Sequence, residues 1–257
     1  MARSERKSDG GIGEIVKTIL YALGIAMVFR IFLFQPFSIP SSSMKPTLLI
    51  GDYLFVSKYA YGYSRYSIPF SPKLFEGRIL GSVPERGDVI VFRNVNDENK
   101  DYIKRLIGLP GDRVRVTDGR LFLNGEAVPV EKVEAFVEPI SGTSGQKCKD
   151  NVTVDGQLLC SKDQYVETLP NGVKHPILDV DGGRGTFDRT REVEVPAGHY
   201  FFLGDNRDNS GDSRTYTVGM VPEEALIGRA EIIFLSSEGS PFTPWTWRFS
   251  RFFNAIE

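Results

Sequence analysis

The longest run of apolar residues in the chain lies near its N-terminus, as IVKTILYALGIAMVFRIFLF over residues 15–34. These 20 residues would form a helix of roughly 30 Å, about the thickness of the hydrocarbon layer of a bilayer. Lys17 and Arg30 interrupt the run near its ends, where long basic side chains can reach the lipid headgroups. The pattern predicts a transmembrane helix over residues 15–34.

A cleaved secretory signal and a buried core helix are alternative interpretations of this run. A cleaved signal should end in small residues, whereas aromatic residues and the sequence QPFSIP follow here. The sequence therefore favours a retained membrane anchor.

The charges before the span indicate its orientation. Basic residues outnumber acidic ones there, with Arg3, Arg6 and Lys7 against Glu5 and Asp9. By the positive-inside rule, residues 1–14 should be cytoplasmic. No second apolar stretch of about 18 residues follows, so the rest of the chain should lie together on the far side of the membrane.

Beyond the span, short runs of Val, Ile, Phe and Tyr bounded by turn residues dominate the pattern. None of them keeps a period of about 3.6 residues over a dozen positions. We therefore expect a mainly β protein with antiparallel sheets and at most short helical turns. The expected strands lie within residues 52–63, 87–95, 101–109, 112–125, 191–205 and 230–237.

The regularity of this pattern changes along the chain. Residues 114–194 are richer in Gly, Asp, Thr and Lys than their flanks, which suggests an inserted region of less regular β structure. Residues 37–113 and 195–257 would then form the main β core. The proline-containing segment 59–86 should be an extended excursion.

The sequence PWTWRF near the C-terminus has alternating aromatic residues. As a strand it would place Trp245, Trp247 and Phe249 on one side, near Arg248 and Arg251. Such aromatic residues favour a membrane interface, and packing in the core is the alternative.

Composition and cysteine content bear on two questions: whether the protein binds nucleic acid, and whether it contains a disulfide. Of 257 residues, 41% are hydrophobic and 25% charged, and the formal net charge is -2, without a long basic tract. Nothing in this composition suggests a nucleic-acid partner. Cys148 and Cys160, in a region expected to be a long loop, could form a disulfide that contributes about 2 to 3 kcal/mol.

Histidine chemistry and an S-x-x-K motif are both poor explanations of the serine-rich stretch IPSSSMKPTLLIGD. His175 precedes a proline in an expected loop, and His199 lies in an expected strand, so a structural or surface role fits each better. Ser42 and Lys45 have the S-x-x-K spacing, but Pro46 disfavours the helical turn that this motif needs.

A lysine that acts as a base must lose its proton near neutral pH. Moving its pKa from ~10.4 toward ~8 by burial costs roughly 3 kcal/mol. In DYIKRLIGLPGD, strand alternation places Lys104 between Tyr102 and Leu106 on one face, where an ammonium is poorly solvated. By itself such a lysine is more often an edge charge, so the pattern needs support from elsewhere.

Support comes from GDNRDNSGDSR, residues 204–214, which concentrates acids, amides, serines and arginines after an apolar strand. A solvated turn or a calcium loop are the alternatives, but arginines at or near the coordinating positions would repel the ion. Acids paired with Arg105 or Arg214 would fix this loop and leave Ser210 or Ser213 to orient a neutral amine.

Four ordered motifs, IPSSSMKPTLLIGD, RGDVIVF, DYIKRLIGLPGD and GDNRDNSGDSR, resemble the motif set of type I signal peptidase, also called leader peptidase. They fall within residues 36–214, and VPEEALIGRA extends the resemblance, whereas the inserted region is not covered. The resemblance implies the signal peptidase fold, with Ser43 as the nucleophile and Lys104 as the general base. Ser41 would assist at the oxyanion and Ser210 would orient the lysine.

The resemblance also assigns supporting and substrate-binding residues. Structural ion pairs are implied between Asp205 and Arg105 and between Asp212 and Arg214. The implied pockets for small substrate side chains are formed by Phe37, Ile39, Met44, Leu48, Tyr102 and Ile103. Ser42 departs from the glycine that is frequent in the family, and the single span departs from the two spans of some members.

The implied function is that of a membrane-anchored serine endopeptidase that cleaves secretory preproteins, without a metal or other cofactor. The resemblance places it in the bacterial inner (cytoplasmic) membrane with the catalytic domain on the outer side, in contact with the lipid bilayer. A self-cleaving Ser/Lys repressor-type domain and a non-catalytic membrane-anchored β domain are the rival hypotheses. The oligomeric state is left open.

Overall fold

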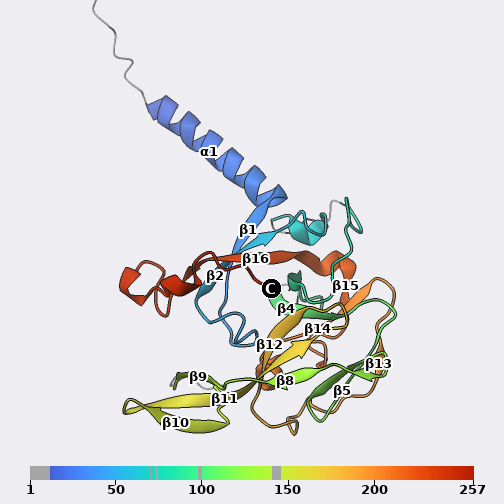
Figure 1. The fold of residues 1–257 in the computed structure, drawn as a ribbon. Helices are drawn as coiled ribbons and strands as arrows, with labels where there is room; N and C mark the ends of the chain where they lie inside the picture. The colour runs from blue at the N-terminus through green and yellow to red at the C-terminus, as the bar shows by residue number, and fades with distance from the viewer. Residues whose placement is uncertain (1–11, 70, 73–74, 98–99, 141–145) are drawn as a thin grey trace, which may run out of the picture.

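One long helix precedes the β structure. The computed structural model describes residues 12–69, 71–72, 75–97, 100–140 and 146–257, so the charges at Arg3, Glu5, Arg6, Lys7 and Asp9 lie outside the described residues. Helix α1 (Ile12–Phe32) has a mean hydropathy of 1.9, and none of it is buried. It projects away from the rest of the chain (Figure 1). Because it packs against no core, the core-helix alternative is excluded.

The main sheet has seven antiparallel strands among the described residues, in the order β1-β2-β16-β3-β4-β14-β15. This architecture confirms the mainly β, antiparallel class. The strands are β1 (Phe34–Ser38), β2 (Asp52–Ser57), β3 (Val89–Arg93), β4 (Asp101–Gly108), β14 (His199–Leu203), β15 (Val221–Pro222) and β16 (Leu226–Ser236).

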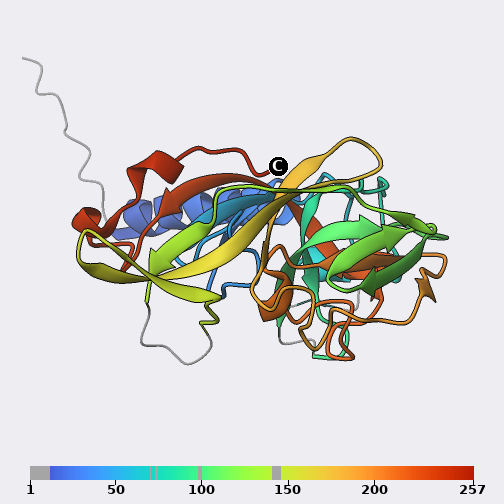
Figure 2. The same ribbon diagram turned by 60° about the horizontal axis from the view of Figure 1, so that its bottom comes forward.

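Two smaller sheets lie in the region between β4 and β14. The four-stranded sheet consists of β13 (Val193–Glu194), β5 (Arg113–Thr117), β6 (Arg120–Leu123) and β7 (Glu126–Ala127). In the other, β11 (Gln157–Thr168) pairs with β8 (Val130–Lys132), β9 (Phe136–Pro139), β10 (Asp150–Val154) and β12 (Lys174–Asp179). The β10–β11 hairpin and the four-stranded sheet lie at opposite ends of the molecule (Figures 1 and 2).

Short 3-10 turns are the only other helical elements in the described part of the chain, as expected. They are η1 (Arg65–Ser67), η2 (Arg207–Asn209), η3 (Glu223–Ala225), η4 (Pro244–Thr246) and η5 (Phe249–Arg251).

Strand β4 is buried on both faces from Lys104 onward, and β14 is buried on both faces from Tyr200 onward. Leu106 and Phe202 belong to the core of the main sheet, whereas Ile107, Phe201 and Leu203 belong to a second core shared with β5 and β6. A strand that is covered on both sides has a nearly continuous apolar sequence. Any polar side chain on β4 is therefore either removed from water or paired.

The prediction of a long loop around the cysteines is wrong. Strands β10 and β11 form a hairpin across Asp155 and Gly156, which both have positive φ angles of 48° and 77°. Asp-Gly with this geometry is the sequence of a type I′ turn, a strong hairpin signal that the polar composition obscured. The disulfide between Cys148 and Cys160, which the sequence alone leaves open, is present.

His175 is also not in a loop. It lies in β12, is 1% exposed, and its Nε2 atom is 3.2 Å from a Glu167 carboxylate oxygen. The loop was inferred from Pro176, but this proline sits opposite Val166 in the β11–β12 pair, a place that proline tolerates when its missing donor is not needed. Burial lowers the pKa of His175 despite the bond to Glu167.

The prediction of a C-terminal strand is wrong as well. The sequence PWTWRF contains the turn η4 and the first residue of the turn η5. Pro244 opens the first turn with a fixed φ and no donor N–H, so the alternation of a strand is lost. Trp245 is 84% exposed, whereas the indole of Trp247 donates to the Pro241 carbonyl and is partly covered.

The carboxylate of Asp52 anchors this C-terminal segment to β2. It has no exposed surface and accepts hydrogen bonds from Arg251 Nη2 (2.6 Å), Ser236 Oγ (2.6 Å) and Leu49 N (2.7 Å). Arg251 also donates to the Thr47 carbonyl (2.9 Å), so one arginine connects the end of the chain to the segment after the serine-rich turn.

Asp52→Asn should lower the free energy of unfolding by about 3 kcal/mol, because it leaves the partly buried Arg251 without its counter-charge. Guanidinium unfolding of the full chain in detergent, followed by tryptophan fluorescence, measures the change. The control is Glu192→Gln, which removes an exposed pair with Arg113 at 3.8 Å and should cost less than about 1 kcal/mol. Equal losses in the two variants would contradict the assignment.

Candidate active site

A serine and a lysine from distant parts of the chain meet at one side of the main sheet. Ser43 lies in the turn that follows β1, and Lys104 lies in β4. The Lys104 Nζ atom is 2.7 Å from Ser43 Oγ and 2.8 Å from the Ile103 carbonyl oxygen. Both side chains are nearly inaccessible, with 7% of Ser43 and 3% of Lys104 exposed.

The surroundings of Lys104 disfavour its charge. Burial lowers the pKa of Lys104 to about 8, although the negative charges of Asp212 and Asp205 act in the opposite direction. The Tyr102 ring lies 5.5 Å from the nitrogen, a contact that favours the charged form and therefore also opposes the effect of burial. A pKa near 8 leaves a useful fraction of neutral amine at physiological pH, so the sequence-based prediction of a lowered pKa is confirmed.

The pair lies in an open cleft of about 550 Å³. In the described part of the chain, β14 pairs with β4 only from Arg105 onward, and β1 pairs only with β2. The first half of β4 and the outer edge of β1 therefore present unpaired backbone groups to the cleft. An extended peptide could add to such edges as a further strand.

The loop 204–214 holds the serine turn. The Asn206 backbone N–H donates to the Ser43 carbonyl (3.1 Å), and the Asn206 side chain donates to the Ser42 carbonyl (3.0 Å). Asn209 donates to Ser42 Oγ (2.7 Å). The sequence pointed to this loop but gave no role to its two asparagines. The only sequence feature that could have indicated a role is the concentration of amides beside the acids.

Two buried ion pairs fix the same loop. Arg105 makes bidentate hydrogen bonds to Asp205 at 2.9 and 2.8 Å. Arg214 does the same to Asp212 at 2.9 Å for both bonds. Burial alone would raise the pKa of each carboxyl, but the arginines outweigh burial and lower both pKa values. Both pairs implied by the resemblance are therefore in place.

The two other serines implied by the resemblance lie close to the pair. Ser41 Oγ is 3.4 Å from Ser43 Oγ at the cleft wall. Ser210 is 7% exposed and packs against Gly204. The hydrogen bonds of the described residues include none between Ser210 and Lys104, so its orienting role stays a prediction.

The predicted substrate-binding residues fall into two groups. Phe37, Ile39, Tyr102 and Ile103 line the cleft. Met44 and Leu48 have no exposed surface and belong to the hydrophobic core, so direct contact of these two with a substrate is not supported.

Lys45, the alternative basic residue, is directed elsewhere. Its ammonium forms an ion pair with Glu138 of β9. Glu138 lies 93 residues away in the chain, and no sequence pattern pointed to this contact.

A serine hydroxyl bonded to a buried amine of lowered pKa, beside free strand edges, is typical of serine peptidases that use lysine in place of histidine. Comparison with known proteins defines the family. Residues 12–235 match the family described as signal peptidase, peptidase S26, and the chain belongs to this family.

Several bacterial relatives are similar over most of their length. Signal peptidase I of Rickettsia typhi is 38% identical over 246 residues, which cover 93% of this chain and 86% of the relative. Signal peptidase I of Rickettsia felis is 41% identical over 226 residues, which cover 85% of this chain and 77% of the relative. A crystal structure of a signal peptidase I from Enterococcus faecalis is 27% identical, covers 58% of this chain and 97% of that chain, and gives a TM-score of 0.30.

Gly204→Ala should abolish most of the activity of this site. A Cβ atom at position 204 would lie 2.2 Å from Ser210 Oγ and 2.5 Å from the Ser43 carbonyl oxygen, so both groups would have to move. Displacement of a reacting group by about 1 Å can cost roughly a hundredfold in rate. The measurement is kcat on a peptide or protein substrate of a signal peptidase.

Gly81→Ala is the control, at an exposed glycine that does not line the cleft. The nearest atom to its added Cβ is Arg78 Cδ at 3.5 Å, an ordinary contact, so this variant should keep its activity. If the two alanine variants lose activity equally, the close packing at Gly204 is not what positions the serine.

Proposed function

We propose that this chain is a membrane-anchored serine endopeptidase that removes N-terminal signal peptides from secretory preproteins, with Ser43 as nucleophile and Lys104 as general base. The observation that carries the proposal is the 2.7 Å contact between Lys104 Nζ and Ser43 Oγ in a member of the signal peptidase family. The lowered pKa of Lys104 supports the direction of proton transfer.

In the proposed mechanism, neutral Lys104 takes the proton of Ser43 as Oγ attacks the carbonyl carbon of the scissile bond. The oxygen of the tetrahedral intermediate is stabilised by the Ser41 hydroxyl and the Ser43 backbone N–H. When the intermediate collapses, Lys104 donates the proton to the leaving amine and an acyl-enzyme remains. Water then attacks the acyl group while Lys104 accepts its proton. The ester bond to Ser43 Oγ breaks, the product leaves as its carboxylic acid, and Lys104 returns the proton to Oγ.

The free edges of β1 and β4 support an extended conformation of the bound substrate. In that conformation alternate side chains face the same wall of the cleft. We infer that small side chains at the substrate's -1 and -3 positions face Phe37, Ile39, Tyr102 and Ile103. Ser210 would limit the rotation of the Lys104 side chain.

The membrane is the proposed location of the reaction. Helix α1 is long and apolar enough to cross a bilayer. Aromatic side chains on the C-terminal segment are also strongly exposed, which favours contact with a lipid interface. These are Phe242 (89%), Trp245 (84%), Phe249 (64%) and Phe253 (72%). We infer a bacterial cytoplasmic membrane, with the N-terminus inside and the catalytic domain outside.

The rival hypotheses explain less. A self-cleaving repressor-type domain does not need an apolar helix of 21 residues. A non-catalytic β domain does not need a buried amine beside a serine.

The assignment of the base predicts a distinct pattern among variants. Lys104→Met and Lys104→Arg should both be inactive, because methionine accepts no proton and arginine stays charged. Ser43→Ala should be equally inactive. In the wild type, kcat/KM should rise as the pH increases through about 8, since the neutral form of Lys104 predominates above its pKa. The measurement is cleavage of one preprotein across pH, with folding checked by circular dichroism.

Lys45→Arg is the control, because it keeps a positive charge for Glu138 and cannot act as a base. It should cleave close to the wild-type rate, and Ser42→Ala should be active. An active, folded Lys104→Met protein or an inactive Lys45→Arg protein would overturn the assignment.

The orientation is tested by adding protease to the outside of intact spheroplasts. The soluble domain should be digested, since the positive-inside rule places it outside. Cytoplasmic marker proteins should stay intact as a control. Protection of the domain until the membrane is lysed would show the opposite orientation.

A further inference from the structure

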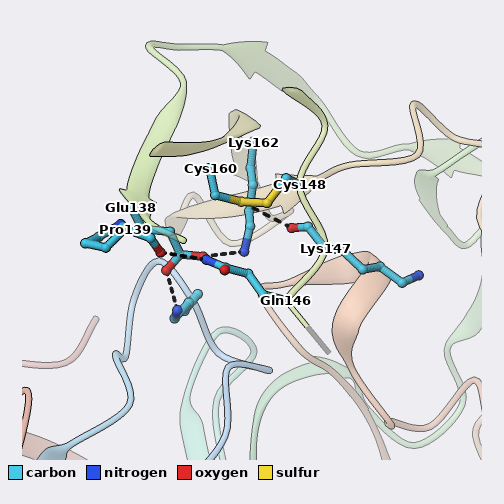
Figure 3. The surroundings of a disulfide bond; sticks show 8 residues. Glu138, Pro139, Gln146, Lys147, Cys148, Cys160 and Lys162 are labelled. Carbon is cyan, nitrogen blue, oxygen red and sulfur yellow. Dashed lines mark hydrogen bonds and ion pairs between the residues drawn. A yellow bond between two sulfur atoms is a disulfide. The ribbon is translucent and has the colours of Figure 1, made fainter. Parts of the chain in front are cut away.

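The carboxylate of Glu138 lies between two lysines from different parts of the chain. One oxygen accepts a hydrogen bond from Lys162 Nζ at 2.6 Å, and the other is bonded to Lys45 Nζ. The side chains of Lys162, Glu138 and Lys45 are 1%, 11% and 12% exposed. Figure 3 shows Glu138 and Lys162 pointing toward each other beside the disulfide.

The charge of Glu138 is maintained by these contacts. Burial alone would raise the pKa of Glu138, but the hydrogen bonds from Lys162 and Lys45 outweigh it and lower the pKa. Exposed ion pairs contribute little, whereas a pair removed from water depends strongly on each partner. Lys162 in particular would be a buried charge without its acid.

The disulfide holds the strand that presents Glu138. Cys160 lies directly opposite Glu138 in the β9–β11 pair. Its bond to Cys148 fixes the segment that carries Gln146, whose amide donates to the Pro139 carbonyl at 2.9 Å. The glutamate is therefore enclosed by covalent and hydrogen-bonded chain on one side (Figure 3).

Lys45 transmits this support to the serine turn. Its backbone N–H donates to the Ser42 carbonyl at 3.1 Å, which closes the turn that contains Ser43. The loop 204–214 holds the same turn through Asn206 and Asn209. The turn thus has two separate attachments, and the proposed mechanism assigns a role to neither of them.

We propose that Glu138 and Lys45 are positioning residues for the reaction, and that the Cys148–Cys160 disulfide keeps Glu138 in place for this purpose. The proposal rests on the proposed role of Ser43. The ion pair sets the distance and direction of Ser43 Oγ relative to Lys104, and neither of its members takes part in proton transfer. Loss of the pair should therefore lower kcat, whereas substrate binding along β1 and β4 is retained.

The test compares Lys45→Met with Lys45→Arg in the full-length protein in detergent, with a purified preprotein as substrate. Lys45→Met has a similar volume but no charge, and we expect kcat to fall about tenfold with KM within about twofold, as for a small misplacement of a reacting group. Lys45→Arg can still bond to Glu138 and should recover most of kcat. If Lys45→Met fails to fold, Lys45→Gln replaces it.

Lys149→Met is the matched control, at a lysine next to Cys148 and just before β10. Lys149 pairs with Asp163 at 2.6 Å and is 42% exposed, with no link to the serine turn among its described contacts. Its kcat should be unchanged. A wild-type kcat for Lys45→Met, or an equal loss for Lys149→Met, would overturn the proposal.

The disulfide is tested by the double variant Cys148→Ala/Cys160→Ala, alone and combined with Lys45→Met. Since both changes would act through the same contact, the combined loss in kcat should be no greater than about that of the more severe change. Multiplied losses would contradict the role of the disulfide. These outcomes are distinct from failure of the proposed function, which would appear as activity in Lys104→Met.

Discussion

The burial of one amine is the constraint on which the rest of this site depends. Reducing the pKa of Lys104 from 10.5 to about 8 corresponds to about 3 kcal/mol of unfavourable desolvation that the fold must offset. Strand β4 provides the offset because apolar side chains cover both of its faces, in two separate cores. A lysine on an ordinary edge strand would be solvated and charged, and the serine beside it would lack the base that we propose.

The ion pairs around this amine follow from the same constraint. Asp205 and Asp212 both raise the pKa of Lys104, and so they act against the neutral amine. Arg105 and Arg214 engage them through bidentate bonds. Pairing positions the loop 204–214 and also weakens the field of the acids at the amine. The arginines therefore affect the electrostatic surroundings of the lysine as well as the shape of the loop.

The sequence predicted the parts of the site whose signals are local. The serine turn, the lysine strand and the acidic loop are each contiguous motifs, and alternation in β4 was enough to place Lys104 against apolar neighbours. Contacts between distant segments could not be predicted in this way. Glu138 and Lys45 are 93 residues apart in the chain. Asn206 donates to backbone carbonyls, which every residue has, so no sequence motif identifies its partners. His175 and the Asp155–Gly156 hairpin were misassigned because proline and polar composition were given more weight than pairing with a neighbouring strand.

The chain length between the membrane helix and the serine adds a geometric consequence. Ser43 follows the end of α1 by eleven residues, so even a fully extended chain would keep it within roughly 40 Å of that end. Part of this segment is β1, which pairs with β2 and forms one wall of the cleft. A substrate held in the same bilayer by its own apolar segment would be confined to the same layer, and confinement raises its effective concentration at the site without any additional contact. Weak binding in the cleft would then be sufficient, because the membrane rather than the cleft would supply most of the encounter.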